Sequence, residues 1–98
     1  MGFKVLIADS ALADLKEIVE FVAHDDPAAA VRLGEKLIEC ALSLQMMAAR
    51  FSFHDQERGI RKMTVPPYLI FYRSDESTMS VSILHFWHGA RRSPQFSG

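Results

Sequence analysis

The chain has 98 residues, of which 49% are apolar and 23% charged, and its formal net charge is −1. This length and composition are typical of one soluble globular domain with a modest core, so we expect a single domain over residues 1–98. A net charge near zero argues against a general nucleic-acid binder. No apolar run approaches the roughly 18 residues of a membrane helix, and no signal-peptide pattern opens the chain, so we expect a cytoplasmic protein outside the membrane.

The charges are divided unevenly along the chain. Residues 1–49 carry 4 basic and 8 acidic side chains, whereas residues 50–98 carry 7 basic and 4 acidic ones. An anionic partner would therefore meet the C-terminal half, although an uneven scatter of solvated charges explains the same numbers.

The chain begins with a strand pattern followed by a helix pattern. Residues 3–8 alternate, with apolar character on both faces, which favours a strand inside a sheet rather than at its edge. Apolar residues then recur at steps of three and four, which predicts a helix ending near Ala23. Asp9 or Ser10 is the predicted N-cap of that helix, because either side chain can accept hydrogen bonds from its first free amides.

A second helix follows at once. Pro27 suits a first helical position, which makes Asp26 the predicted N-cap. The apolar periodicity continues to Met47. Gly34 costs about 1 kcal/mol relative to alanine in a helix interior, and a close approach to the first helix would offset that cost. The two segments together predict a helical hairpin with one apolar side.

The second half of the chain reads as a loop and three strands. Residues 48–57 show no period and predict the loop. The strand-like runs lie at residues 60–65, 68–73 and 79–87. Pro66 and Pro67 separate the first two runs, and the polar residues 74–78 separate the last two. The order β-α-α-β-β-β predicts an α+β fold of two layers, in which a helical hairpin covers one face of a mainly antiparallel sheet.

The last two strand runs are apolar on both faces. Alternation predicts the faces of the first as Tyr68, Ile70 and Tyr72 against Leu69, Phe71 and Arg73. It predicts those of the second as Val81, Ile83 and Trp87 against Leu84 and Phe86. Because two helices cover only one face, the other face needs a further layer or a protein partner. The predicted partner-binding side chains are Leu69, Phe71, Leu84 and Phe86.

Five short segments are spaced along nearly the whole chain. They are ALADLKEIVEFV at 11–22, DPAAA at 26–30, GIR at 59–61, YLIFYR at 68–73 and ILHFWHGAR at 83–91. In this order and spacing they resemble the ParE/RelE superfamily of toxins from bacterial type II toxin-antitoxin systems. The ending from His88 to Arg91 is more similar to the ParE branch. One departure is the stretch 46–50, which lacks a proline that the family often has there.

The resemblance implies a small cytoplasmic toxin that a co-expressed antitoxin neutralises by wrapping a flexible tail over it, in a toxin-antitoxin hetero-oligomer. It also implies that the antitoxin is the partner on the spare apolar face. ParE-like members are associated with poisoning DNA gyrase, whereas RelE-like members cut messenger RNA in the ribosome. The residues must therefore distinguish a binding poison from a nuclease.

Metal-free RNA cleavage needs a base, an acid and cations that meet at one phosphate. The nuclease candidates are Arg61, Arg73, His88 and Arg91, with Tyr72 as a further possible acid. On a strand, Arg61 and Lys62 point to opposite faces, and so do His85 and His88. The chain is also mildly acidic, whereas ribosome binding favours basic proteins. We therefore expect a non-enzymatic gyrase inhibitor, with a ribosome-dependent mRNA endoribonuclease, or an inactive relative that only binds its antitoxin, as alternatives.

The predicted target contacts are Arg61, His88, Arg91 and Arg92. Arg91 and Arg92 lie beyond the last strand, where they suit an anionic target or acidic antitoxin residues. Structural roles remain open for the other two, because Arg61 could pin the sheet by an ion pair and His88 could hold the turn at Gly89. Carboxylates are absent near His88 in the sequence and Cys40 is the single cysteine, so we expect no metal and no cofactor.

Overall fold

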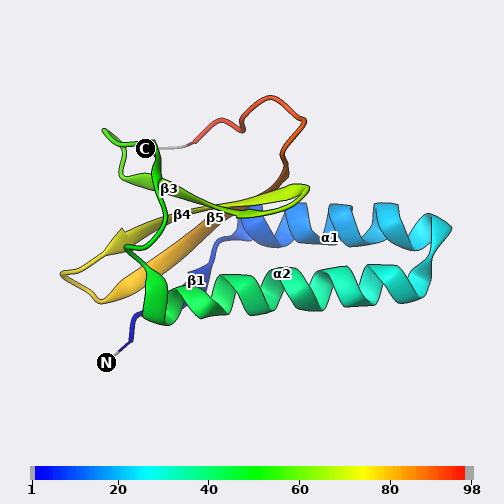
Figure 1. Cartoon of the computed structure of the whole chain (residues 1–98), viewed down its shortest axis with the longest axis horizontal. Coiled ribbons are helices and arrows are strands. Elements are labelled where there is room, and N and C mark those ends of the chain that lie inside the picture. The colour runs from blue at the N-terminus through cyan, green and yellow to red at the C-terminus, as the bar shows by residue number, and fades with distance from the viewer. Residues whose placement is uncertain (1, 97–98) are drawn as a thin grey trace.

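Two helices pack on one face of a five-stranded sheet with the strand order β1-β5-β4-β3-β2 (Figure 1). The computed structural model describes residues 2–96. Its elements are β1 (Lys4–Ile7), α1 (Asp9–Asp25), α2 (Pro27–Met47), β2 (Phe53–Asp55), β3 (Ile60–Val65), β4 (Tyr68–Asp75) and β5 (Ser80–His88). This α+β arrangement of two layers confirms the predicted fold class. The three strands after β2 lie within two residues of their predicted ends.

The first strand lies at an edge of the sheet, so the prediction of an inner position is wrong. β1 runs parallel to β5, and the other neighbouring strands pair antiparallel. The apolar residues on the two sides of β1 differ in burial. Phe3, Val5 and Ile7 pack against the core. Leu6 points to the other side and is 44% exposed, because no helix covers that side of the strand.

The two helix starts use different caps. Ala8 is the N-cap of α1 and offers no side-chain hydrogen bond, so the predicted capping by Asp9 or Ser10 is wrong. The Ser10 hydroxyl instead donates to the carbonyl of Leu84 at 2.7 Å, which ties α1 to β5. In α2 the carboxylate of Asp26 accepts from the Ala29 amide at 3.0 Å, which confirms the predicted N-cap.

The helices approach each other closely at Gly34. A Cβ atom added at Gly34 would lie 3.2 Å from Val19 Cγ2 on α1. This separation is tighter than ordinary van der Waals contact, so the missing side chain is what allows α1 and α2 to lie so close. The predicted approach of the two helices is confirmed.

A short strand occupies part of the predicted loop. β2 pairs antiparallel with β3, placing Phe53 opposite Arg61, and the register shifts between Phe53 and Asp55. The prediction of a continuous loop over residues 48–57 is therefore wrong. A strand of three residues is too short to display alternation, which explains why the sequence pattern missed it.

A bulge in β5 changes which side chains share a face. Phe71 pairs with His85 while its neighbour Tyr72 pairs with Ile83, so Leu84 is left over between them. The prediction that side chains alternate strictly along this strand is therefore wrong at this point. Phe86 is 1% exposed in the core beneath the helices with Ile83, so its assignment to the partner-binding face is also wrong.

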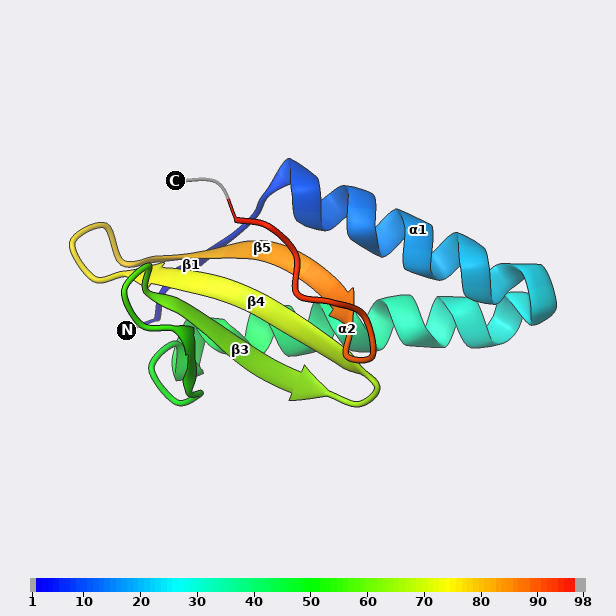
Figure 2. The ribbon, with the colours of Figure 1, turned by 90° about the horizontal axis from the view of Figure 1, so that it is seen from above.

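The C-terminal tail, residues 89–96, crosses the sheet on the side opposite the helices (Figures 1 and 2). The Phe96 ring meets that of Phe71 edge-on at 5.4 Å between centroids, and Phe71 is 1% exposed. Pro94 is also buried. The further layer predicted for this face therefore comes in part from the chain itself. We call this side the tail face and the other the helix face.

Candidate functional site

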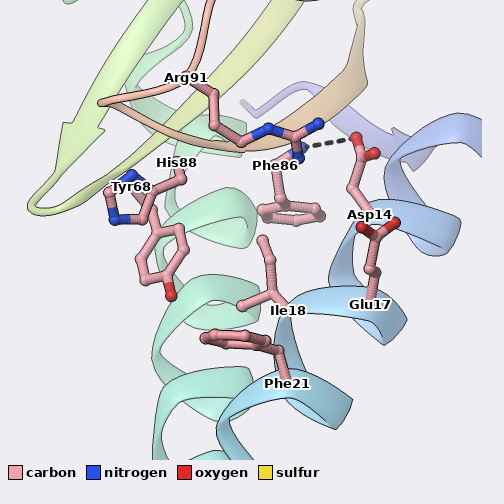
Figure 3. A pocket seen from close by; sticks show the side chains of 8 residues that line it. All are labelled: Asp14, Glu17, Ile18, Phe21, Tyr68, Phe86, His88 and Arg91. Carbon is pink, nitrogen blue, oxygen red and sulfur yellow. Dashed lines mark hydrogen bonds between the residues drawn. The ribbon is translucent and has the colours of Figure 1, made fainter.

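A cavity of about 300 Å³ lies between α1 and the β4–β5 pair, at the end of the sheet where β5 finishes (Figure 3). Its lining residues are Asp14, Glu17, Ile18, Phe21, Tyr68, Phe86, His88 and Arg91. Ile18, Tyr68 and Phe86 make an apolar floor, while Glu17 and Arg91 bring opposite charges to the rim. We call this the α1–β5 cavity. It contains two predicted target contacts, His88 and Arg91.

Asp14 fixes one wall of the cavity. Its Oδ2 atom accepts from the Phe86 amide at 3.2 Å and lies 2.7 Å from His85 Nδ1. An ionised carboxylate only accepts, so His85 Nδ1 is the donor. The Asp14 and His85 side chains are 17% and 16% exposed, so the pair is largely shielded from water. It joins α1 to β5 across the sheet edge, just beyond the point where β1 ends.

The opposite wall is the turn after β5. The Ala90 amide donates to His88 Nδ1 at 3.1 Å, which confirms that His88 holds this turn. The Gly89 amide donates to the Pro67 carbonyl at 2.8 Å, and a Cβ atom on Gly89 would lie 3.1 Å from that same oxygen. The close approach of the two turns therefore favours glycine. Because Nδ1 of His88 accepts, Nε2 carries the proton in the neutral ring.

Two exposed side chains complete the cavity. The guanidinium carbon of Arg91 lies 4.3 Å from the centre of the Trp87 ring, a cation–π contact that orients the side chain. In Figure 3 Arg91 reaches over the top of the cavity, while Phe21 stands on α1 at the other end. Phe21 is 78% exposed. Phe21 was not predicted as a site residue, although its position three residues after Ile18 places the two side chains on the same side of α1.

Arg61 lies at the other end of the sheet. Its Nη1 atom donates to the Phe51 carbonyl at 2.6 Å, and its guanidinium carbon lies 3.9 Å from the centre of the Phe53 ring. Arg61 therefore pins the segment after α2 to β3. It does so through backbone carbonyls, not through the ion pair that the sequence offered as an alternative.

Tyr72, the possible acid, is fully buried on the helix face. Its hydroxyl donates to the Ala48 carbonyl at 2.8 Å. Burial raises the pKa of this hydroxyl above the ordinary 10.0, and the neighbouring Arg61 opposes the increase. A buried donor whose proton is held this firmly has no route to a substrate.

The four charged nuclease candidates do not meet at one site, because His88 and Arg91 line the α1–β5 cavity whereas Arg61 and Arg73 lie outside it. Tyr72, which pairs with Arg61, and Tyr68, which pairs with His88, are four residues apart on β4, about 13 Å along a strand. Arg73 lies on the tail face, where its Nε atom donates to the Arg58 carbonyl at 2.9 Å. The strand registers also confirm that Arg61 and Lys62 point to opposite faces.

The remaining predicted contacts differ in how far they are exposed. Leu69 and Leu84 are half-buried, and Phe71 is covered by Phe96. The carbonyl of Arg92 accepts from the Trp87 indole at 2.8 Å, while the Arg92 residue itself is exposed. Of the four predicted partner contacts, Phe86 lies in the core on the helix face, whereas Phe71 lies on the tail face.

Within residues 2–96, no three His, Cys, Asp or Glu side chains are grouped as metal ligands would be. In the same range, no helix combines the length and apolar character needed to span a membrane.

Comparison with known proteins identifies the family. The family model described as "ParE toxin of type II toxin-antitoxin system, parDE" matches residues 5–93, whereas no curated protein matches. The chain is similar in structure to the "Chromosomal ParDE TA system from P. aeruginosa", with a TM-score of 0.77 and 20% identity over 88% of this chain and 95% of that one. It is also similar to a chain of the toxin-antitoxin complex RelBE2 from Mycobacterium tuberculosis, with a TM-score of 0.68 and 23% identity over 90% of this chain and 99% of that one. At these identities the likenesses show a common fold, and the family match covers most of the chain. The chain belongs to the ParE family of type II toxin-antitoxin toxins.

Proposed function

We propose that this chain is held inactive by a cognate antitoxin and that, once released, it inhibits DNA gyrase by binding rather than by cutting RNA. The observation that carries the proposal is the separation of Arg61 and Arg73 from the cavity that His88 and Arg91 line. Metal-free RNA cleavage needs an acid, a base and cations within hydrogen-bond reach of one phosphate. Arg61 and His88 pair with residues of β4 that lie about 13 Å apart along the strand, and this spacing supports a binding role.

The engagement of the individual groups supports the same proposal. The Arg61 guanidinium is occupied by a backbone carbonyl, and the Nδ1 atom of His88 by a backbone amide. Arg91 is exposed and stacked on Trp87, which suits recognition of a protein surface.

An antitoxin partner is supported by the family and by the two structural relatives, which belong to a ParDE system and a RelBE2 complex. Leu69 and Leu84 are half-buried and are our proposed antitoxin contacts. Contact with Phe71 would require Phe96 to move aside.

The experiment adds purified toxin to a gyrase supercoiling assay and, separately, to a translating ribosome extract in which mRNA ends are mapped. We expect loss of supercoiling, intact mRNA, and recovery of supercoiling when the antitoxin from the neighbouring reading frame is added. Position-specific mRNA cuts with normal supercoiling would instead identify a RelE-like nuclease. Antitoxin binding without either effect would identify an inactive relative.

A further inference from the structure

We propose that the α1–β5 cavity is the surface by which this toxin grips its target protein, and that it takes an apolar side chain of the target flanked by a lysine or arginine. This inference rests on the proposed function, in which the toxin acts by binding a protein. It goes beyond that function by naming the site and the chemistry of the segment that enters it.

The exposed aromatic ring is the first observation. Phe21 is 78% exposed on α1, directly beside the apolar floor formed by Ile18 and Phe86 (Figure 3). The packing of α1 against α2 uses Val19 instead, whose Cγ2 atom faces Gly34. Phe21 therefore contributes little to the fold. An exposed aromatic residue at the mouth of an apolar hollow is typical of a binding hot spot.

The size of the cavity sets the class of occupant. About 300 Å³ is at the lower limit of the range for sites that bind small molecules, roughly 300–1,000 Å³. Such a volume accepts one or two side chains from a protein surface. The apolar floor selects an aliphatic or aromatic side chain, since a polar group placed there would lose its water without gaining a partner.

The rim charges select the neighbour of that side chain. Within residues 2–96, the salt bridges are those of Arg58 with Asp55 and His85 with Asp14, so the Glu17 carboxylate is not engaged in one. Arg91 is stacked on Trp87 instead of pairing with Glu17. A cationic side chain of the target can therefore pair with Glu17. The acidic N-terminal half of the chain favours the same sign of partner.

The other hollow and the tail face fit such an anchor less well. The hollow between the helices is lined by Leu15, Gly34, Glu35, Ile38 and Glu39, none of them aromatic. On the tail face, Phe96 already covers Phe71. The α1–β5 cavity combines an open apolar floor with an exposed aromatic ring and the predicted target contacts His88 and Arg91.

The test compares two pairs of variants on α1. Phe21→Ser removes the aromatic wall, and Leu12→Ser is its control, because Leu12 is 48% exposed on the same helix but does not line the cavity. Glu17→Arg reverses the rim charge, and Glu20→Arg makes the same change at an exposed position outside the lining. Each variant is measured for growth inhibition without antitoxin, for the toxin concentration that halves gyrase supercoiling, for antitoxin binding and for thermal unfolding.

We expect Phe21→Ser to raise the half-inhibitory concentration about tenfold or more and to relieve growth inhibition, as loss of a hot spot does. Glu17→Arg should raise it about fivefold. The two controls should stay within about twofold of the wild type, with folding and antitoxin binding retained throughout.

The alternative outcomes separate the inference from the proposed function. If the wild type inhibits gyrase and Phe21→Ser remains fully toxic, the inference about the cavity is overturned and the proposed function stands. Loss of antitoxin binding with unchanged toxicity would assign the cavity to the antitoxin and also overturn it. A wild type that slows growth without affecting supercoiling would remove gyrase as the target, while relief of that growth inhibition by Phe21→Ser would still support the cavity.

Discussion

The two faces of the sheet are buried by different means. On the helix face, Tyr72, Ile83 and Phe86 lie under two helices and are at most 1% exposed. On the tail face, Phe71 is equally buried, yet its cover is the His54 ring of the short strand β2, 4.7 Å away between centroids, and a tail without regular secondary structure. The weaker part of this cover is the tail segment. That segment is held mainly by side chains, such as Arg58, which donates to the Phe96 carbonyl at 3.0 Å. Equal burial therefore does not mean equal strength, since a cover of this kind can lift without unfolding the sheet.

The largest expected effect tests this difference with one substitution on each face. Phe86→Ala should lower the free energy of unfolding by about 3–5 kcal/mol, because the helices cannot close around the cavity it leaves. Phe71→Ala should cost less, about 2 kcal/mol, since the tail can settle into the vacated space. Urea unfolding of both variants measures the difference. Equal losses would show that the two covers are equally rigid.

The next effect concerns the edge where the two faces meet. Asp14→Ala should cost about 1–3 kcal/mol, because it leaves the Phe86 amide and the His85 ring without their acceptor. Glu17→Ala, three residues later and exposed, should stay within about 0.5 kcal/mol of the wild type. Thermal unfolding of the pair checks the prediction. A neutral Asp14→Ala would mean that water replaces the carboxylate at no cost.

The tail itself should matter less than either. Phe96→Ala removes a half-buried ring from Phe71 and should cost about 1–2 kcal/mol. It should also increase binding of a hydrophobic dye while far-ultraviolet circular dichroism stays unchanged. Gln95→Ala, at an exposed neighbouring position, should change neither signal. Unaltered dye binding in Phe96→Ala would show that the tail does not shield this face.

The smallest effect is on the helix face and depends on pH. Tyr72→Phe should cost about 1 kcal/mol at neutral pH, since it removes the bond to the Ala48 carbonyl. The folded-state pKa of Tyr72 is raised, so its stabilising effect is present below pH 10.0 and is lost as the pH rises through the folded-state value. Denaturation should therefore show a smaller difference in the free energy of unfolding between wild type and variant above pH 10.0 than at neutral pH. A larger difference above pH 10.0 would contradict the raised pKa of Tyr72.

Much of the fold could be predicted because its signals are local. The apolar periodicity of the helices, the Asp26 cap and the prolines between β3 and β4 each act within a few residues. What escaped depends on distant pairing. β2 is too short to display a period, and the edge position of β1 depends on which strands join β5.

The candidate site was less accessible for the same reason. His88 and Arg91 were found because they lie at the end of the last strand and just after it. The pairing of Asp14 with His85 joins residues 71 positions apart, and neither has a local feature that indicates the other. The burial of Phe86 depends on the bulge at Leu84, which appears only when β5 is paired with β4.

The extra residue Leu84 divides β5 into two halves whose side-chain alternation is out of phase. Each half keeps its own alternation. One half pairs with Ser74 and Asp75, and the other carries His85 and His88, so the residue numbers that face the core follow a different parity in each half. Deleting Leu84 would bring the halves into phase and leave Ile83 and Phe86 on the helix face, because Ile83 already pairs with Tyr72 and His85 with Phe71. A one-residue insertion or deletion elsewhere in β5 would instead exchange the core and surface sides of the part that follows it, although the composition would barely differ.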